Sequence, residues 1–189
     1  MLMRPALTRH AARLNAAMPL VLFTDDRDAD WVRAARALPR GGVVVIRARD
    51  AKARTRLLGQ LRPLAHLRLL VADDPGLAKK ADGLHLPEAR MREAPHWRAR
   101  YPRWIITTAA HSLGALLMAR EVDAIFLSPI FATVSHPRAR PLTPVRAAFI
   151  AGASQVPVYA LGGIDARNAA FLAPAFSGIA AISSLLCGR

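Results

Sequence analysis

The sequence predicts an α/β fold, a single compact (β/α)8 TIM barrel in which eight parallel strands alternate with helices. Short apolar runs recur along the 189 residues, and each is followed by a longer alanine- and arginine-rich segment with helical spacing. Val43–Ile46 is apolar at every position, which is typical of a parallel strand buried on both faces. An open doubly wound sheet usually has a glycine-rich turn after its first strand. Residues 24–27 contain no glycine, so we expect the sheet to close.

The elements follow in chain order. Residues 1–18 contain three arginines and no acidic residue, and we interpret them as an N-terminal helix that caps the barrel rather than as a targeting signal. Strands are predicted at residues 20–24, 43–47, 67–71, 83–86, 104–107, 124–127, 156–160 and 179–182. Helices are predicted at residues 29–38, 51–61, 75–80, 89–100, 112–120, 144–152, 166–173 and 184–187. No linker divides the chain, so residues 1–189 are expected to form one domain.

Composition narrows the classes of function. The net charge of +14 would attract polyanions, but the basic residues are scattered and no aromatic-rich binding motif accompanies them, which argues against a nucleic-acid partner. The single cysteine, Cys187, can form no internal disulfide and fits a reducing cytoplasm. No apolar run reaches the roughly 20 residues of a membrane-spanning helix, so no membrane partner is expected. The short helices leave apolar surface that a second copy of the chain could cover in a homo-oligomer.

Two late turns predict a phosphate site. Gly162 and Gly163 lie between an apolar strand and an expected helix, and about twenty residues later Ser183 and Ser184 follow the last strand. Glycines let backbone amides approach an anion closely, and the positive end of a helix would lie behind them. Loops after the seventh and eighth strands of such barrels often share one phosphate. A plain turn would also explain the two glycines alone. The longest irregular segment, residues 128–143, lies on the same face.

Sequence blocks in register resemble a known family. Residues 128–137, 160–164 and 181–184 are similar to the three late signatures of thiamine phosphate synthases. Upstream, further short blocks fall in the same order as in that family, at residues 24–25, 42–43, 49–50, 72–73, 81–86 and 110–113. The chain therefore resembles the thiamine phosphate synthase/TenI (thiazole tautomerase) superfamily over nearly its whole length.

The resemblance implies a barrel that binds a phosphorylated thiazole. In the synthases this ligand is joined to a pyrimidine methyl diphosphate with loss of pyrophosphate, and Mg²⁺ assists the departure of the pyrophosphate. A tautomerase of the same superfamily moves a proton on the thiazole carboxylate phosphate and needs no metal. We assign contacts with substrate or phosphate to Arg49, Thr133, Ser135, His136, Gly162, Gly163, Ser183 and Ser184.

The chain departs from the synthase pattern at the metal and pyrimidine positions. Asp73 matches the first metal carboxylate, but Ala89 stands at the second, with only Glu88 adjacent. Arg47 replaces the glutamine that contacts the pyrimidine, and His136 replaces a loop lysine. The thiazole-phosphate half looks kept, which favours a diverged or tautomerase-like member. An active Mg²⁺-dependent synthase and a non-catalytic phosphate-binding barrel remain as alternatives.

The resemblance to the tautomerase branch implies that His111 carries the proton. Histidine suits this task because its ordinary pKa lies near neutral pH. His111 could instead cap a helix, and Asp73 could cap the helix that follows it. Arg47 and Arg49 would point to opposite faces of a continued strand, and we favour Arg49 at the barrel mouth. His85 lies between two leucines and is interpreted as an interior residue of the barrel.

Overall fold

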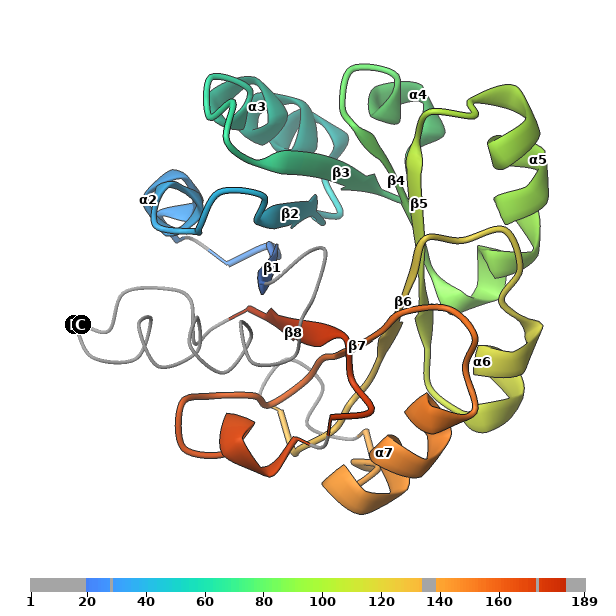
Figure 1. Cartoon of the computed structure of the whole chain (residues 1–189). Helices are drawn as coiled ribbons and strands as arrows, with labels where there is room; N and C mark the ends of the chain where they lie inside the picture. Colours follow the sequence, from blue (N-terminus) through green and yellow to red (C-terminus); the bar gives the residue numbers. More distant parts are fainter. Residues whose placement is uncertain (1–19, 28, 134–138, 173, 183–189) are drawn as a thin grey trace.

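The eight predicted strands form a closed parallel barrel. The computed structural model describes residues 20–27, 29–133, 139–172 and 174–182. Neighbours in the ring follow the chain order, and β8 pairs with β1 to close it (Figure 1). The strands are β1 Leu20–Phe23, β2 Val43–Ile46, β3 Arg68–Ala72, β4 Gly83–Leu86, β5 Ile105–Ala110, β6 Ala124–Leu127, β7 Val158–Ala160 and β8 Gly178–Ala181. The prediction of a (β/α)8 barrel is confirmed.

Helices surround the ring on its outside (Figure 1). The α-helices are α2 Trp31–Arg36, α3 Ala51–Leu61, α4 Pro75–Ala78, α5 Ala94–Arg100, α6 Leu113–Met118 and α7 Pro144–Gly152, and the 3₁₀ helices are η1 Glu88–Glu93 and η2 Ala169–Phe171. The single helix predicted at residues 89–100 is therefore two elements. The helix predicted at residues 166–173 is wrong, since its described part holds only the short η2 turn. The helices expected at residues 1–18 and 184–187 lie outside the described residues.

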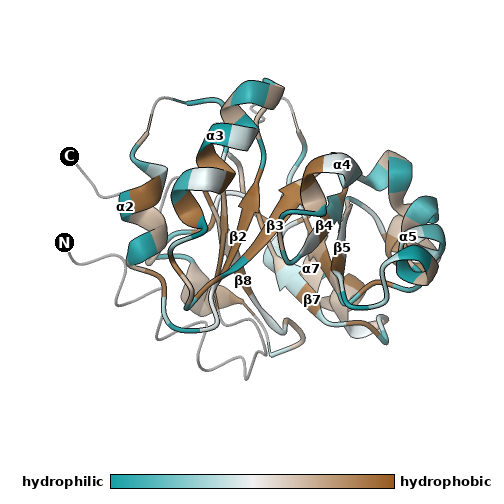
Figure 2. Cartoon of the chain, turned by 90° about the horizontal axis from the view of Figure 1, so that it is seen from above, coloured by the Kyte–Doolittle hydropathy of each residue, from teal (hydrophilic) through white to brown (hydrophobic). Residues whose placement is uncertain are grey.

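The barrel buries both faces of its strands. Val45, Phe23 and Phe126 belong to a cluster inside the ring, whereas Val44 and Ile46 pack in the outer cluster beneath the helices. This two-sided burial explains why strands such as β1 and β2 are apolar at every position. In Figure 2 apolar colour runs along strands such as β2 and β3, whereas helices such as α2 and α3 carry both apolar and polar colour.

Capping residues fix where several helices begin. Asp30, Asp50, Asp74 and Ser112 each accept a hydrogen bond from a backbone N–H in the first turn of α2, α3, α4 and α6, respectively. Each cap lies in the loop that leaves the carboxyl end of a strand. The caps therefore fix the ends of these loops at the carboxyl ends of the strands. We call this end of the barrel the mouth. No helix within the described ranges is long and apolar enough to cross a membrane.

Candidate functional site at the barrel mouth

Arg47 and Arg49 follow β2 and lie in different surroundings. The backbone N–H of Arg47 donates to Thr24 Oγ1 at 2.9 Å, and its side chain is largely withdrawn from solvent, which lowers its pKa below the ordinary arginine value. Arg49 has a side chain that is 98% exposed, and its Nε lies 3.6 Å from Asp26 Oδ2. The charge of Arg47 also acts on the buried His85. Of the two arginines, Arg47 is thus the more buried, whereas Arg49, which the sequence favoured at the mouth, has an exposed side chain paired with Asp26.

His85 is an interior residue of the barrel, as the sequence predicts. Its Nδ1 lies 3.0 Å from Thr107 Oγ1, and its ring packs edge-on against Phe23 and Phe126. Burial, and to a smaller extent the charge of Arg47, lowers the pKa of His85 to about 3. The imidazole is therefore neutral at physiological pH, and Thr107 is its polar partner.

Glu88 holds His111 in a defined position. Glu88 Oε2 accepts a hydrogen bond from the His111 backbone N–H at 2.7 Å and lies 2.6 Å from His111 Nδ1. Helix α6 is capped by Ser112, whose Oγ accepts from the Ala115 N–H, so the interpretation of His111 as a cap is wrong. The His111 side chain is 54% exposed at the mouth. Its Nε2 makes no hydrogen bond within the described part of the chain and can face a ligand.

Sequence reasoning did not find Glu88 as the partner of His111. The two residues are 23 positions apart and belong to the loops after β4 and β5. Strand register brings them together, because Leu86 pairs with Thr108, and Glu88 and His111 follow these two residues by two and three positions. The predicted barrel already makes β4 and β5 parallel neighbours, but β5 extends beyond its predicted end at residue 107, so the position of His111 relative to Glu88 was not predicted.

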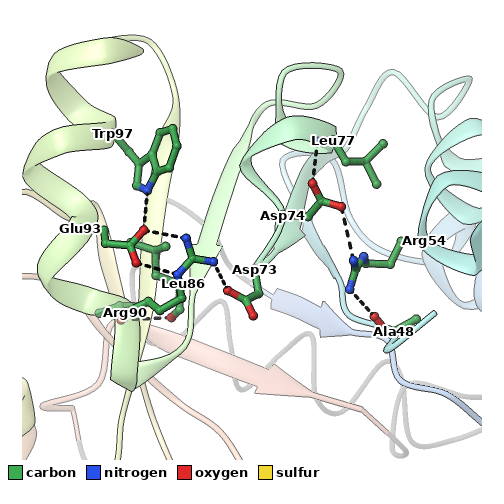
Figure 3. Close-up of polar contacts among 10 residues, drawn as sticks. Ala48, Arg54, Asp73, Asp74, Leu77, Leu86, Arg90, Glu93 and Trp97 are labelled. Atoms are coloured by element: carbon green, nitrogen blue, oxygen red, sulfur yellow. Dashed lines mark hydrogen bonds and ion pairs between the residues drawn. The ribbon is translucent and has the colours of Figure 1, made fainter. Parts of the chain in front are cut away.

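Two adjacent aspartates after β3 have separate partners (Figure 3). Asp74 accepts from the Leu77 N–H at 2.9 Å, which caps α4, and from Arg54 Nη2 at 3.3 Å. Asp73 forms an ion pair with Arg90. The interpretation of Asp73 as the helix cap is therefore wrong, since its neighbour takes that role.

The mouth does not offer the ligands that Mg²⁺ requires. Mg²⁺ binds oxygen ligands in near-octahedral geometry, often through two carboxylates. Here the carboxylate of Asp73 is already paired with a guanidinium, and Ala89 has no donor atom. Among the described residues, no group of three or more His, Cys, Asp or Glu side chains could hold a metal ion. The residues present thus do not fit the metal that the resemblance implies for a synthase.

The opposite side of the mouth is built from backbone. Gly162 and Gly163 have φ of 95° and 66°, in the left-handed region that favours glycine. A Cβ on Gly163 would lie 2.3 Å from the Ala132 carbonyl oxygen, and one on Gly162 would lie 2.8 Å from Pro129 Cα. The N–H groups of both glycines donate to no group in the described ranges. This turn therefore presents two adjacent amide donors, packed tightly against the loop after β6.

Some predicted contacts with the ligand can be located and others cannot. Thr133 is half-buried, next to Ala132, whose carbonyl lies against Gly163. The expected helix behind the glycines is absent, so no helix dipole of that kind supports the turn. Four candidates lie outside the described residues, namely Ser135, His136, Ser183 and Ser184.

A basic cavity of about 400 Å³ lies at the other end of the barrel. Arg62, Arg68, Lys79 and Lys80 line it, near the amino-terminal ends of β3 and β4. Arg62 and Lys79 are the C-caps of α3 and α4, where a cation offsets the negative end of the helix. Arg68 pairs with Asp82. The helix ends and the ion pair thus account for Arg62, Lys79 and Arg68, and we place the candidate site at the mouth instead.

Comparison with known proteins defines the family. The family model described as thiamine monophosphate synthase matches residues 20–185. The thiamine-phosphate synthase of Chloroflexus aurantiacus is 34% identical over 161 residues, which cover 77% of this chain and 73% of that protein. The thiamine-phosphate synthase of Methanoculleus marisnigri is 31% identical over 190 residues, covering 88% and 87%.

A solved structure agrees with these relatives. The thiamine phosphate pyrophosphorylase from Pyrococcus furiosus aligns with a TM-score of 0.71 and 26% identity, over 90% of this chain and 88% of that one. The matched barrel, and a family model that spans most of the chain, lead to the same class of protein. The chain belongs to the thiamine monophosphate synthase family.

Proposed function

We propose that this chain is a tautomerase-like enzyme that binds a phosphorylated thiazole carboxylate at the barrel mouth and moves a proton on it. The observation that carries the proposal is the contact of 2.6 Å between Glu88 Oε2 and His111 Nδ1. A histidine held by a carboxylate at the open end of a TIM barrel is well suited to general acid–base chemistry.

Glu88 fixes the tautomer of His111. Its carboxylate accepts a hydrogen bond from Nδ1–H, which leaves the lone pair of Nε2 free to take a proton from the ligand. Once Nε2 is protonated, the same carboxylate stabilises the imidazolium, and the proton can return to another atom of the ligand. Because the Glu88 side chain also accepts from the His111 N–H, the ring and the backbone are held by one group.

The phosphate of the ligand binds on the glycine side of the mouth. The N–H groups of Gly162 and Gly163, which donate to no group in the described ranges, supply two donors, and Thr133 lies beside them. Ser135, His136, Ser183 and Ser184 complete this part of the site in our proposal, on the basis of the family resemblance. Arg47 is the cation for the ligand carboxylate, since Arg49 lies in solvent.

Deuterium exchange on the thiazole carboxylate phosphate in D₂O, followed by proton NMR, tests the proposal. His111→Ala should lower the exchange rate by about 100-fold or more, and Glu88→Gln by about tenfold, since general acid–base groups contribute factors of this order. His96→Ala is the matched control, because His96 is exposed on α5 and should leave the rate unchanged. Exchange that persists at the full rate in the His111→Ala variant would remove His111 from the proposed role.

The second candidate is a working synthase, and the names of the relatives favour it. In that case the chain joins the phosphorylated thiazole to a pyrimidine methyl diphosphate, and the family resemblance implies a requirement for Mg²⁺. Incubation with both substrates and Mg²⁺ distinguishes the two, because only a synthase forms thiamine phosphate. Tight binding of the thiazole phosphate without exchange or product would instead indicate a non-catalytic binding barrel. Retention on random DNA that falls with salt would support a nucleic-acid partner.

A further inference from the structure

Arg90 joins two carboxylates at the mouth between β3 and β4 (Figure 3). Its Nε and Nη2 donate to the two oxygens of Glu93 at 2.7 and 2.6 Å, and its Nη1 donates to Asp73 Oδ1. Glu93 Oε2 also accepts from Trp97 Nε1 at 3.1 Å. All three nitrogens of the guanidinium are engaged, so its plane is fixed between the two acidic groups.

The backbone holds Asp73 in place for this contact. Asp73 has φ of 55°, a left-handed conformation that few residues adopt and that aspartate tolerates better than most. Its N–H donates to the carbonyl of His85 at 2.9 Å, which ties the loop after β3 to the neighbouring strand β4. The side chain makes no helix cap, since Asp74 fills that role. The carboxylate of Asp73 is thus committed to Arg90.

The guanidinium and the two carboxylates of this cluster stabilise each other's charged forms. The hydrogen bonds that Arg90 donates to Glu93, and then to Asp73, raise the pKa of Arg90, and the hydrogen bond that Glu93 accepts from Arg90 is the main cause that lowers the pKa of Glu93. Arginine does not lose its proton in proteins, so the positive charge is permanent. Two carboxylates and one guanidinium leave a net charge of −1, which does not attract an anionic ligand.

We propose that the guanidinium of Arg90 takes the position of a divalent cation at this mouth, as a resident cation that belongs to the chain. Asp73 is the carboxylate that the family resemblance assigns to the metal, and it is occupied by Arg90. A dication at Asp73 would meet the fixed positive charge of the guanidinium that already pairs with Asp73 Oδ1. The inference concerns the cation alone, so it does not depend on the thiazole ligand or on His111.

Removal of the Arg90 side chain would leave a potential metal site between Asp73 and Glu93. Asp73 and Glu93 bind the same guanidinium from different sides, so its removal leaves two carboxylates facing one position. Glu93 keeps its hydrogen bond from Trp97, and Asp73 keeps its backbone tie to His85. Two convergent carboxylates with room for water are a usual site for Mg²⁺ or Mn²⁺.

Titration of the purified full-length chain with Mn²⁺, followed by the EPR signal of the free ion, tests the inference. The unaltered chain should show no stoichiometric Mn²⁺ binding below about 1 mM, the range of weak protein sites. Arg90→Ala should bind one Mn²⁺ about tenfold more tightly or better, because a neighbouring positive charge is lost. Arg90→Ala combined with Asp73→Asn should lose this gain.

Two controls separate the role of Arg90 from a general effect of charge. Arg92→Ala removes an exposed arginine from the same 3₁₀ helix η1 and should not gain Mn²⁺ affinity. Arg90→Lys keeps a positive charge and should exclude Mn²⁺ as the unaltered chain does. Circular dichroism establishes that each variant is folded before titration.

Two results would overturn the inference. The first is micromolar, stoichiometric binding of Mn²⁺ by the unaltered chain, if the substitution Asp73→Asn abolishes that binding. This test does not require a stable Arg90 variant. The other is a folded Arg90→Ala variant that binds Mn²⁺ no better than the unaltered chain. Neither measurement uses a thiazole ligand, so failure of the proposed function would appear separately, in the exchange experiment.

Discussion

The two sides of the barrel mouth are built from different chemical groups. After β3, β4 and β5, charged side chains meet in the pairs Asp73 with Arg90 and Glu88 with His111. After β7, the turn at Gly162 and Gly163 offers two backbone N–H groups and no charged side chain of its own. The charged groups of the first side already have partners, whereas the second side has N–H donors that bond to no group within the described ranges.

This difference indicates that the anion binds on one side of the mouth and that proton transfer takes place on the other. An anion gains most where donors lack partners, because it replaces water there without breaking an ion pair. A proton carrier gains most where a neighbouring group fixes its orientation, as Glu88 does for His111. The mouth therefore has an anchoring side made of backbone and a reacting side made of paired side chains.

Gly163→Ala should have the largest effect on stability and ligand affinity, because it alters the side of the mouth that anchors the anion. The new Cβ would lie 2.3 Å from the Ala132 carbonyl oxygen, and alanine disfavours the φ of 66°. Strain of this kind costs about 2–4 kcal/mol. We expect a lower free energy of unfolding in urea and, by calorimetry, at least about tenfold weaker binding of the phosphorylated thiazole.

Gly59→Ala is the matched control for this prediction. Gly59 lies within α3, and nothing lies within 4 Å of the position of its Cβ. The same substitution should therefore stabilise the chain by about 0.5–1 kcal/mol through helix propensity and leave ligand affinity unchanged. Unaltered affinity in a folded Gly163→Ala variant would mean that the anion is bound elsewhere.

His85 should give the next largest effect, because it lies beneath the reacting side without a counter-ion. Its pKa is about 3 in the folded chain, against an ordinary value of 6.5. The unfolded chain therefore binds more protons between these values, and stability falls as the pH drops below about 6.5. At pH 5 this group should destabilise the fold by roughly 2 kcal/mol relative to neutral pH.

His85→Gln isolates this contribution from the other titrating groups. Glutamine can still hydrogen-bond to Thr107 Oγ1 but carries no charge. Urea unfolding at pH 7.5 and pH 5 should show that the unaltered chain loses about 2 kcal/mol more than the variant. An equal loss in both proteins would mean that His85 titrates with its ordinary pKa.

The strands could be predicted from the sequence because their signal is local. A parallel strand buried on both faces must be apolar at each position, and Val43–Ile46 satisfies this without reference to any other segment. Strand β5 extends further than predicted, to Ala110, because it pairs with β6 up to Leu127. Pairing between strands is not visible in the pattern of β5 alone.

The alanine content of residues 166–173 predicted a helix, but local hydrogen bonds of side chains favour a turn there. Asp165 Oδ1 accepts from the N–H groups of Arg167 and Asn168, and Asn168 Oδ1 accepts from the Asp165 N–H. These side chains satisfy the backbone in a turn, which competes with a helix. Pro174 then follows and cannot continue a helix.

The reacting side of the mouth could be predicted only in part. His111 and Asp73 were found because each lies in a recognisable block of the family. Their partners, Glu88 and Arg90, come from the loop after β4 and are separated from them by 23 and 17 residues. The same register of β4 between β3 and β5 produces both contacts. Pairs of this kind depend on the exact register of neighbouring strands, which the predicted order of strands in a barrel does not give.

Asp74→Ala and Asp73→Asn give the smallest expected effects, and their difference tests whether the two aspartates have separate roles. Asp74 caps α4 and accepts from Arg54, which is mostly buried, so its loss should cost about 1–2 kcal/mol in urea unfolding. Asp73 and Arg90 are both partly exposed, and such pairs contribute less than about 1 kcal/mol. Asp73→Asn should therefore leave the fold nearly as stable as before. Equal losses of unfolding free energy in the two variants would mean that Asp73 stabilises the fold through its ion pair with Arg90. The role of Arg90 could then not be limited to occupying the position of a divalent cation.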